Sequence, residues 1–152
     1  MITAGESLLE QVGPGPVAID TACFIYFAEA HERYASLLRP LFAAADAGAL
    51  QLVTSIVTLL EVVVVPYRAG ASELAVRYEL LLTRSRGINL VAAGAAEARL
   101  AAQLRAQYGM RTPDALQLAT GLEARCTAFV TNDRAFPSIP GLPVIQLDSL
   151  VA

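Results

Sequence analysis

Short apolar runs alternate with longer segments of helical period along the 152-residue chain, and this alternation is the strongest constraint on its fold. Strands that alternate with helices favour a parallel sheet that is covered on both faces. We therefore expect the α/β class, as a three-layer α/β/α sandwich with a central parallel sheet of about five strands. The apolar runs that predict strands cover residues 16–20, 50–53, 88–91, 127–131 and, as a short fifth strand, 143–146.

The segments between these runs repeat their apolar residues at every third or fourth position, which is typical of helices. Proline marks two of them: Pro40 predicts a kink or break, and Pro66 predicts the end of a helix. The expected N-caps are Thr54 or Ser55, then Ser72 and Thr112. The expected helices cover residues 22–30, 34–45, 54–65, a segment between 72 and 87, 96–108 and a last one that opens at 112.

No repeat or interdomain linker is visible, so we expect one domain over residues 17–152, preceded by an N-terminal extension of residues 1–16. The most apolar stretch, residues 50–65, is shorter than the roughly 18 to 20 residues of a membrane span, so no membrane association is expected. The N-terminus carries no early basic residue and no signal-type apolar core, which indicates a cytoplasmic protein.

The composition argues against several classes of function. All eleven basic residues are Arg, and a chain without Lys has neither a P-loop nor a catalytic Lys. The net charge of −3 is not typical of a nucleic-acid binder, although a nuclease site built of acids would itself lower the pI. Cys23 and Cys126 lack the spacing of metal ligands and are expected to be small buried hydrophobes.

Four acidic residues stand where they could meet at one edge of the predicted sheet: Asp20, Glu61, Asp114 and Asp133. Each also has a purely structural explanation. Asp20 or Asp133 could cap a helix, although Thr21 could cap the first helix equally well, and Asp114 could complement a helix dipole. Glu61 could form a salt bridge to a distant arginine.

Glu61 is the least ordinary of these residues, because its helix is apolar nearly all round and should be buried. A lone buried carboxylate is disfavoured unless it is paired, protonated or bound to a metal. Carboxylates gathered on one rim with no cationic partner between them would repel one another unless divalent cations neutralised them. An oxygen-rich cluster suits Mg²⁺ or Mn²⁺ rather than zinc, and the single His, His31, is expected at the surface.

Four segments resemble the motifs of PIN domains, most closely those of the VapC-type toxin nucleases of bacterial toxin–antitoxin pairs. They are residues 18–27 (AIDTACFIYF), 54–61 (TSIVTLLE), 111–119 (RTPDALQLA) and 131–136 (TNDRAF). The resemblance implies the sandwich fold expected above and Mg²⁺- or Mn²⁺-dependent cleavage of RNA, usually by a homodimer. The chain departs from the family in the roughly 15 residues that precede its first strand.

Carried over by position, Asp20, Glu61, Asp114 and Asp133 match the acidic quartet of the family. Thr21 and Thr131 match its hydroxyl residues beside the first and fourth acids. We expect the first three acids to hold one cation, with Asp133 helping at a second or through water, and Thr131 and Asn132 to orient the carboxylates. Arg111 and Arg134 are the candidates for phosphate contacts.

The expected function is therefore a metal-dependent endoribonuclease, the toxin of a type II toxin–antitoxin pair, with a cognate antitoxin as its partner. A non-catalytic PIN-like module that binds RNA or another protein is the alternative. A phosphotransfer protein of receiver or dehalogenase type also places Asp after the first strand. It usually needs a Lys, which this chain lacks, and residues 20–22 read DTA rather than the DxD of the dehalogenase type.

Overall fold

The computed structural model describes residues 1–151 and contains one parallel sheet of five strands. The strands lie in the order β3–β2–β1–β4–β5, and each neighbouring pair is parallel. The expected α/β class and the number of strands are therefore confirmed. The strands are β1 (Val17–Ile19), β2 (Leu52–Ser55), β3 (Ile88–Val91), β4 (Ala128–Thr131) and β5 (Val144–Gln146).

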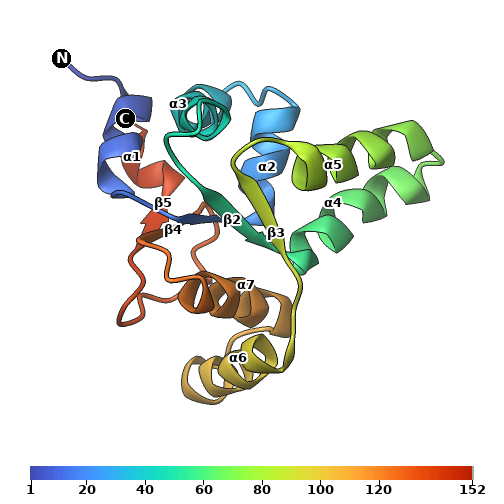
Figure 1. The fold of residues 1–152 in the computed structure, drawn as a ribbon, viewed down its shortest axis with the longest axis vertical. Helices are drawn as coiled ribbons and strands as arrows, with labels where there is room; N and C mark the ends of the chain where they lie inside the picture. Colours follow the sequence, from blue (N-terminus) through green and yellow to red (C-terminus); the bar gives the residue numbers. More distant parts are fainter. Residues whose placement is uncertain (152) are drawn as a thin grey trace.

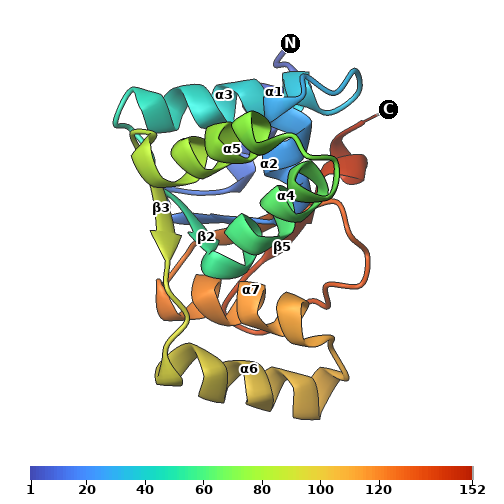
Figure 2. The same ribbon diagram turned by 90° about the vertical axis from the view of Figure 1, so that its right-hand side faces the viewer.

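Helices cover both faces of this sheet, as expected for parallel strands that are apolar on both sides. In Figure 2, α1 to α5 lie on one face and α7 on the other, with α6 packed on the outside of α7. Two apolar clusters fill the space on either side of the sheet. The helices are α1 (Ala4–Gln11), α2 (Thr21–Ala28), α3 (Ala35–Asp46), α4 (Ile56–Arg68), α5 (Ser72–Arg84), α6 (Ala95–Tyr108), α7 (Thr112–Glu123) and the 3₁₀ helix η1 (Leu147–Leu150).

The strand order places the topological switch between β1 and β4, because the chain winds outward from β1 in one direction and from β4 in the other. In open parallel sheets, ligands bind beyond the carboxyl ends of the strands at such a switch. Ile19 pairs with Val130 across this boundary, so the residues that follow these strands share one edge. The edge beyond Ile19 and Val130 is where a functional site is expected.

The N-terminal extension of residues 1–16 contributes a helix that the sequence interpretation did not identify. The hydroxyl of Thr3 accepts a hydrogen bond from the Glu6 N–H, and the Glu6 carboxylate accepts one from the Thr3 N–H, which caps α1. Leu8 and Val12 are completely buried, and Figure 1 shows α1 beside α3. The extension is therefore packed into the core of the domain.

Several helix ends differ from those predicted. Pro66 does not end α4, because a proline in the last turn removes only one backbone hydrogen bond and its ring is buried, so the helix continues to Arg68. Pro40 likewise lies inside α3. Ser55 caps α4 with a 3.1 Å hydrogen bond from the Val57 N–H. The other two expected caps are wrong, since Ala71 and Arg111 occupy the N-cap positions of α5 and α7.

Helix α4 is not buried all round, contrary to the prediction. Leu60 is 67% exposed and Val65 is 65% exposed, whereas Thr58 and Val62 face the interior. Figure 1 shows the reason: the pair α4 and α5 extends away from the sheet, so one side of each helix has nothing to cover it. Among residues 1–151 no helix is long and apolar enough to cross a membrane.

Candidate active site

Asp20 lies at the switch between β1 and β4. Its backbone N–H donates to the carbonyl of Val130 at 3.0 Å, which extends the strand pairing past Ile19. Its Oδ1 accepts a 2.7 Å hydrogen bond from the N–H of Thr21, and its Oδ2 accepts one of 2.7 Å from the hydroxyl of Thr131. Asp20 is therefore the N-cap of α2, a role that the sequence interpretation had also considered for Thr21. Capping does not remove Asp20 from the shared edge, because the same buried carboxylate also contacts Thr131.

Glu61 reaches the same edge from α4. It is half-buried, and its Oε1 accepts a 2.7 Å hydrogen bond from the hydroxyl of Thr21, the residue directly after Asp20. Among the described residues Glu61 forms no ion pair, so the salt bridge to a distant arginine is not found.

Asp114, in the first turn of α7, is paired with a cation, and the expectation of an acid cluster without one is wrong. Arg111 Nε lies 3.2 Å from Asp114 Oδ2, and Arg111 Nη2 lies 3.4 Å from Oδ1. The two partners differ in exposure: the side chain of Asp114 is 12% exposed and that of Arg111 is 72% exposed. The exposed arginine therefore pairs with a mostly buried carboxylate.

Asp133 follows β4 and is tied to Asp20 through Thr131. The hydroxyl of Thr131 accepts a 3.0 Å hydrogen bond from the Asp133 N–H while it donates to Asp20. The Asp133 carboxylate accepts a 2.9 Å hydrogen bond from the Ala135 N–H, which stabilises a turn, whereas the sequence had suggested that it could cap a helix. Thr131 thus contacts both acids that flank the switch between the strands.

The remaining sequence candidates lie near these acids without touching them. The side-chain oxygen of Asn132 accepts a 3.0 Å hydrogen bond from the Asp148 N–H, so it holds η1 instead of orienting one of the four carboxylates. Arg134 is exposed and lines a hollow of about 410 Å³ together with Phe136 and Gln146. Arg134 follows Asp133 directly in the chain and is accessible from solvent.

The electrostatics indicate that the charges of Glu61 and Asp114 act on Asp20. The pKa of Asp20 is raised to about 6 in total: burial is the largest cause, the hydrogen bonds from Thr131 and Thr21 oppose it, and the charges of Glu61 and Asp114 add to it. The pKa of Arg111 is raised by its hydrogen bond to Asp114, then by the charges of Asp114, Asp133 and Glu61. The arginine therefore lies in the field of three of the four acids.

Within residues 1–151, no three side chains of His, Cys, Asp or Glu are close enough together to enclose a metal ion as they stand. Two carboxylates are turned to other partners, since Asp114 faces Arg111 and Asp133 faces the Ala135 N–H. The donor set is nevertheless composed of carboxylate oxygens, which are the ligands that Mg²⁺ and Mn²⁺ prefer. A bound cation would relieve the repulsion from Glu61 and Asp114, which adds to the effect of burial on the pKa of Asp20.

The sequence interpretation missed a group of buried polar residues beneath Glu61. Gln117 donates from Nε2 to the hydroxyls of Thr21 and Thr58, at 2.9 Å in each case. Thr58 lies three residues before Glu61, and Gln117 lies three residues after Asp114. A polar residue one helical turn from a candidate acid, in an otherwise apolar segment, is the signal that could have identified both.

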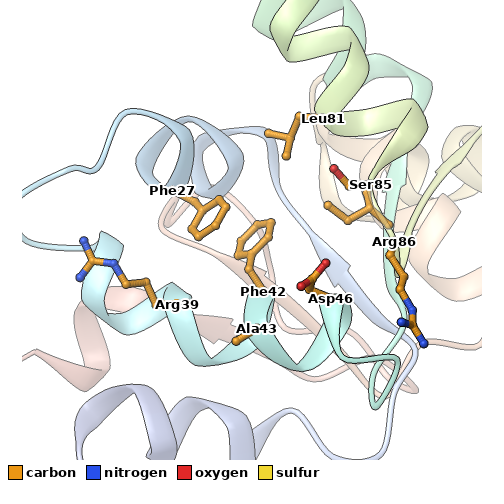
Figure 3. Close-up of a pocket in the computed structure, with 9 residues that line it drawn as sticks. Phe27, Arg39, Phe42, Ala43, Asp46, Leu81, Ser85 and Arg86 are labelled. Atoms are coloured by element: carbon orange, nitrogen blue, oxygen red, sulfur yellow. The ribbon is translucent and has the colours of Figure 1, made fainter.

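A cavity of about 450 Å³ lies between α2, α3 and α5 at the amino end of β3, and none of the four acids lines it. Figure 3 shows residues that line this cavity. Phe27 and Phe42 stack face to face in it with ring centroids 3.9 Å apart, and Leu81 points toward them (Figure 3). Arg39 and Asp46 stand at its rim. Its apolar lining and its place at the opposite end of the strands separate it from the candidate active site.

The order of the motifs, the sheet and the acids at its edge define a known class of protein. The family model for the PIN domain matches residues 17–142, and the chain belongs to this family. A search of curated proteins found no match.

Solved structures with similar folds include chains from three complexes. A toxin–antitoxin complex from Klebsiella pneumoniae is similar with a TM-score of 0.64 and 23% identity. VapBC2 from Rickettsia felis, bound to a DNA fragment from its promoter, is similar with a TM-score of 0.65 and 16% identity. DNA-bound VapBC from Salmonella typhimurium is similar with a TM-score of 0.65 and 19% identity. Each comparison covers 86% of this chain and 97% of the other, which establishes the PIN-like fold.

Proposed function

We propose that the chain is a metal-dependent endoribonuclease that cleaves RNA phosphodiester bonds at the edge marked by Asp20, Glu61, Asp114 and Asp133. The proposal rests above all on Asp20, which is buried at the topological switch and has its pKa raised to about 6 by burial and by neighbouring acids. An ionisable group perturbed in this way at such a place is characteristic of functional sites.

Asp20, Glu61 and Asp114 would hold one Mg²⁺ or Mn²⁺, with Asp133 at a second ion or bound through water. A cation held there supplies charge stabilisation for the attack of water on a phosphodiester. Thr131 would keep one oxygen of Asp20 fixed, and Thr21 would do the same for Glu61, through the 2.7 Å hydrogen bonds described above.

Arg111 would exchange Asp114 for a phosphate of the substrate when a cation is bound. Its guanidinium now neutralises Asp114, but its side chain is 72% exposed, so it is free to turn outward. It would then offer a fork of N–H donors to a phosphate of the substrate, and the exposed Arg134 would offer a second one. These two arginines provide positive charge beside the acids in a chain whose net charge is −3.

The partners that we propose are a cognate antitoxin and a second copy of the chain, in the cytoplasm. The three similar structures are described as toxin–antitoxin or VapBC complexes, which supports the toxin of a type II pair. The apolar cavity between α2, α3 and α5 would accept apolar side chains of the antitoxin. The exposed Leu60 and Val65 of α4, with Val76 and Leu80 of α5, would be covered in a homodimer.

The decisive experiment combines Mn²⁺ calorimetry with an RNA cleavage assay on the wild type and on Asp20→Asn. The wild type should bind Mn²⁺ and cleave RNA, and chelation by EDTA should stop cleavage. Asp20→Asn should lose both properties. Asp46→Asn, which alters an exposed acid at the rim of the distant cavity, is the matched control and should retain both. Cleavage that persists in Asp20→Asn would remove Asp20 from the site.

The second candidate function is a non-catalytic PIN module that binds RNA or another protein. The ion pair of Arg111 with Asp114 favours it, because an arginine neutralises part of the acid cluster without a metal. A wild type that binds RNA without cleaving it, and takes up no Mn²⁺ in calorimetry, would establish the module in place of the nuclease.

A further inference from the structure

A connected set of buried polar side chains lies beneath Glu61 and joins α2, β2, α4 and α7. Thr21, Thr54, Thr58 and Gln117 are all nearly inaccessible to solvent. Buried polar groups in such a set stabilise the fold only when every donor has an acceptor. The direction of each hydrogen bond can therefore be worked out from the number of protons available.

Gln117 fixes the direction of the whole set, because an amide nitrogen donates and does not accept. One of its two N–H groups points to Thr21 Oγ1 and the other to Thr58 Oγ1, each at 2.9 Å. Each hydroxyl then has a single proton of its own to donate elsewhere. Thr21 donates to Glu61 Oε1 at 2.7 Å.

The far side of the set is equally determined. Thr54 donates to the carbonyl of Ile19 at 3.1 Å, so its oxygen is left as an acceptor. Thr58, 2.7 Å from Thr54, must therefore be the donor between the two. Because Thr58 donates its proton to Thr54, it cannot also donate to Thr21, whose Oγ1 lies 3.1 Å away. The Thr21 hydroxyl donates its own proton to Glu61.

We propose that Gln117 is a positioning residue for Glu61. Because Gln117 donates to both Thr21 and Thr58, the Glu61 carboxylate is the acceptor that remains for the proton of the Thr21 hydroxyl. This inference rests on the proposed metal site, and Gln117 itself touches neither metal nor substrate. Glu61 depends on Thr21 because that hydroxyl is its one hydrogen-bond donor among the described residues. The arrangement holds Oε1 and leaves Oε2 for a ligand.

The same residue connects two of the acids. Gln117 lies one turn after Asp114 on α7, and its contacts reach Thr21 on α2 and Thr58 on α4. Thr58 in turn lies one turn before Glu61 on α4. The helices that carry Asp114 and Glu61 are thereby both in contact with one amide.

The test measures Mn²⁺ affinity by calorimetry on the full chain in five variants. Thr21→Val removes the donor to Glu61 and should weaken Mn²⁺ binding by about 10- to 100-fold, as for other groups that orient a metal ligand. Gln117→Met keeps the side-chain length without donors and should weaken binding by about 10-fold, at the low end of that range. The double variant should bind no more weakly than Thr21→Val, because Gln117 acts through Thr21.

Thr120→Val is the matched control. Thr120 is buried on the same helix, and its hydroxyl donates to the Leu116 carbonyl at 2.9 Å, outside the set around Gln117. It should leave the Mn²⁺ affinity unchanged. Gln117→Leu provides a second donor-free side chain of different shape, and it should weaken Mn²⁺ binding as Gln117→Met does, provided the loss comes from missing donors. Gln117→Leu also provides the measurement if Gln117→Met does not fold.

Two results would overturn the inference alone: Gln117 variants with the Mn²⁺ affinity of Thr120→Val, or a double variant in which the two losses multiply. In both cases the wild type would still bind Mn²⁺ and Asp20→Asn would not, so the proposed nuclease site would stand. A wild type that takes up no Mn²⁺, or an Asp20→Asn variant that binds it normally, would overturn the site and the inference together.

Discussion

The hydroxyl of Thr131 donates a 2.7 Å hydrogen bond to Asp20 Oδ2 across the boundary between β4 and β1. The two residues are 111 positions apart in the chain, yet the parallel pairing of Ile19 with Val130 brings them together. The same hydroxyl accepts from the Asp133 N–H, so a single side chain holds both acids at the switch. This contact is the strongest link between the fold and the proposed chemistry.

Thr131→Val should therefore weaken both the fold and the site. A buried hydrogen bond to a charged group contributes about 1.5 to 3 kcal/mol, and urea unfolding near pH 8 should show a loss of that size. The pKa of Asp20 should rise above its value of about 6, because this bond lowers it. Thr83→Val, which removes an exposed hydroxyl bonded to the Glu79 carbonyl, should change stability by less than about 0.5 kcal/mol. Equal losses in the two variants would contradict the assignment.

The pH dependence of stability should carry the signature of Asp20. Its pKa rises from 3.8 to about 6 on folding, so the folded state holds the proton more tightly than the unfolded chain does. The stability contributed by the protonated carboxyl is present at low pH and is lost as pH rises from about 4 to about 6. At higher pH the ionised Asp20 costs the fold about 3 kcal/mol at most.

Asp20→Asn should remove that cost. Without metal, and with EDTA present, the variant should be more stable than the wild type near pH 8, and the difference should shrink toward pH 4. Urea unfolding at a series of pH values measures both curves. Added Mn²⁺ should stabilise the wild type alone, with an effect that fades as pH falls through about 6. Parallel curves for the two proteins would show that Asp20 does not titrate in this range.

Arg111→Met should separate the two roles proposed for the arginine. Because Arg111 competes with a cation for Asp114, its removal should tighten Mn²⁺ binding by several-fold, while the KM for RNA should rise as a phosphate contact is lost. The effect on stability should stay below about 1 kcal/mol, because the arginine is largely exposed. Arg99→Met, at an exposed position on α6, should change none of these quantities. Weaker Mn²⁺ binding would mean that Arg111 organises the site instead of competing for it.

The fold and the position of the acids could be predicted because both depend on local patterns. The alternation of strands and helices determines a parallel sheet, and a residue that ends a parallel strand must lie at its carboxyl edge. Asp20, which follows β1, and Asp133, which follows β4, were placed in this way. Thr131 was identified from the same motif, and its hydroxyl contacts Asp20.

The direction of long or isolated side chains could not be predicted from such patterns. Arg111 stands three residues before Asp114, but nothing in the spacing says whether its flexible guanidinium turns inward or toward solvent. Gln117 and Thr58 were passed over as single polar residues in apolar helices, although Gln117 has partners on two other elements and Thr58 on three. Contacts between distant segments become visible only when the helices are placed in space.

The burial of helix α4 was predicted wrongly. An apolar helix was expected to be buried, yet Leu60 and Val65 of α4 face solvent. An apolar pattern does not specify whether the rest of the chain covers each apolar side chain. Helix α1 is the opposite case: its capping pair, Thr3 and Glu6, was visible in residues treated as an extension.

Leu60→Gln should weaken self-association. If a second copy covers the exposed side of α4 and α5, a polar amide at Leu60, which is 67% exposed, would be desolvated in the interface without a partner. Sedimentation should then show a dimer for the wild type and a shift toward monomer for Leu60→Gln, with monomer stability nearly unchanged. Ile2→Gln, also at an exposed apolar position but before α1, should leave the dimer intact. A monomeric wild type would remove the proposed homodimer.

Leu8→Ala should destabilise the whole domain, although residue 8 precedes the segment that matches the family. Leu8 is completely buried in the cluster that also contains Leu38 and Leu41 of α3, so truncation leaves a cavity as well as less buried apolar surface. Substitutions of this kind cost about 2 to 5 kcal/mol. Leu80→Ala, on the exposed side of α5, should cost less than about 0.5 kcal/mol in the monomer. Urea unfolding should show one cooperative transition shifted to lower urea for Leu8→Ala, because α1 shares the core of the sheet. An unchanged transition would mean that residues 1–16 lie on the domain without contributing to its stability.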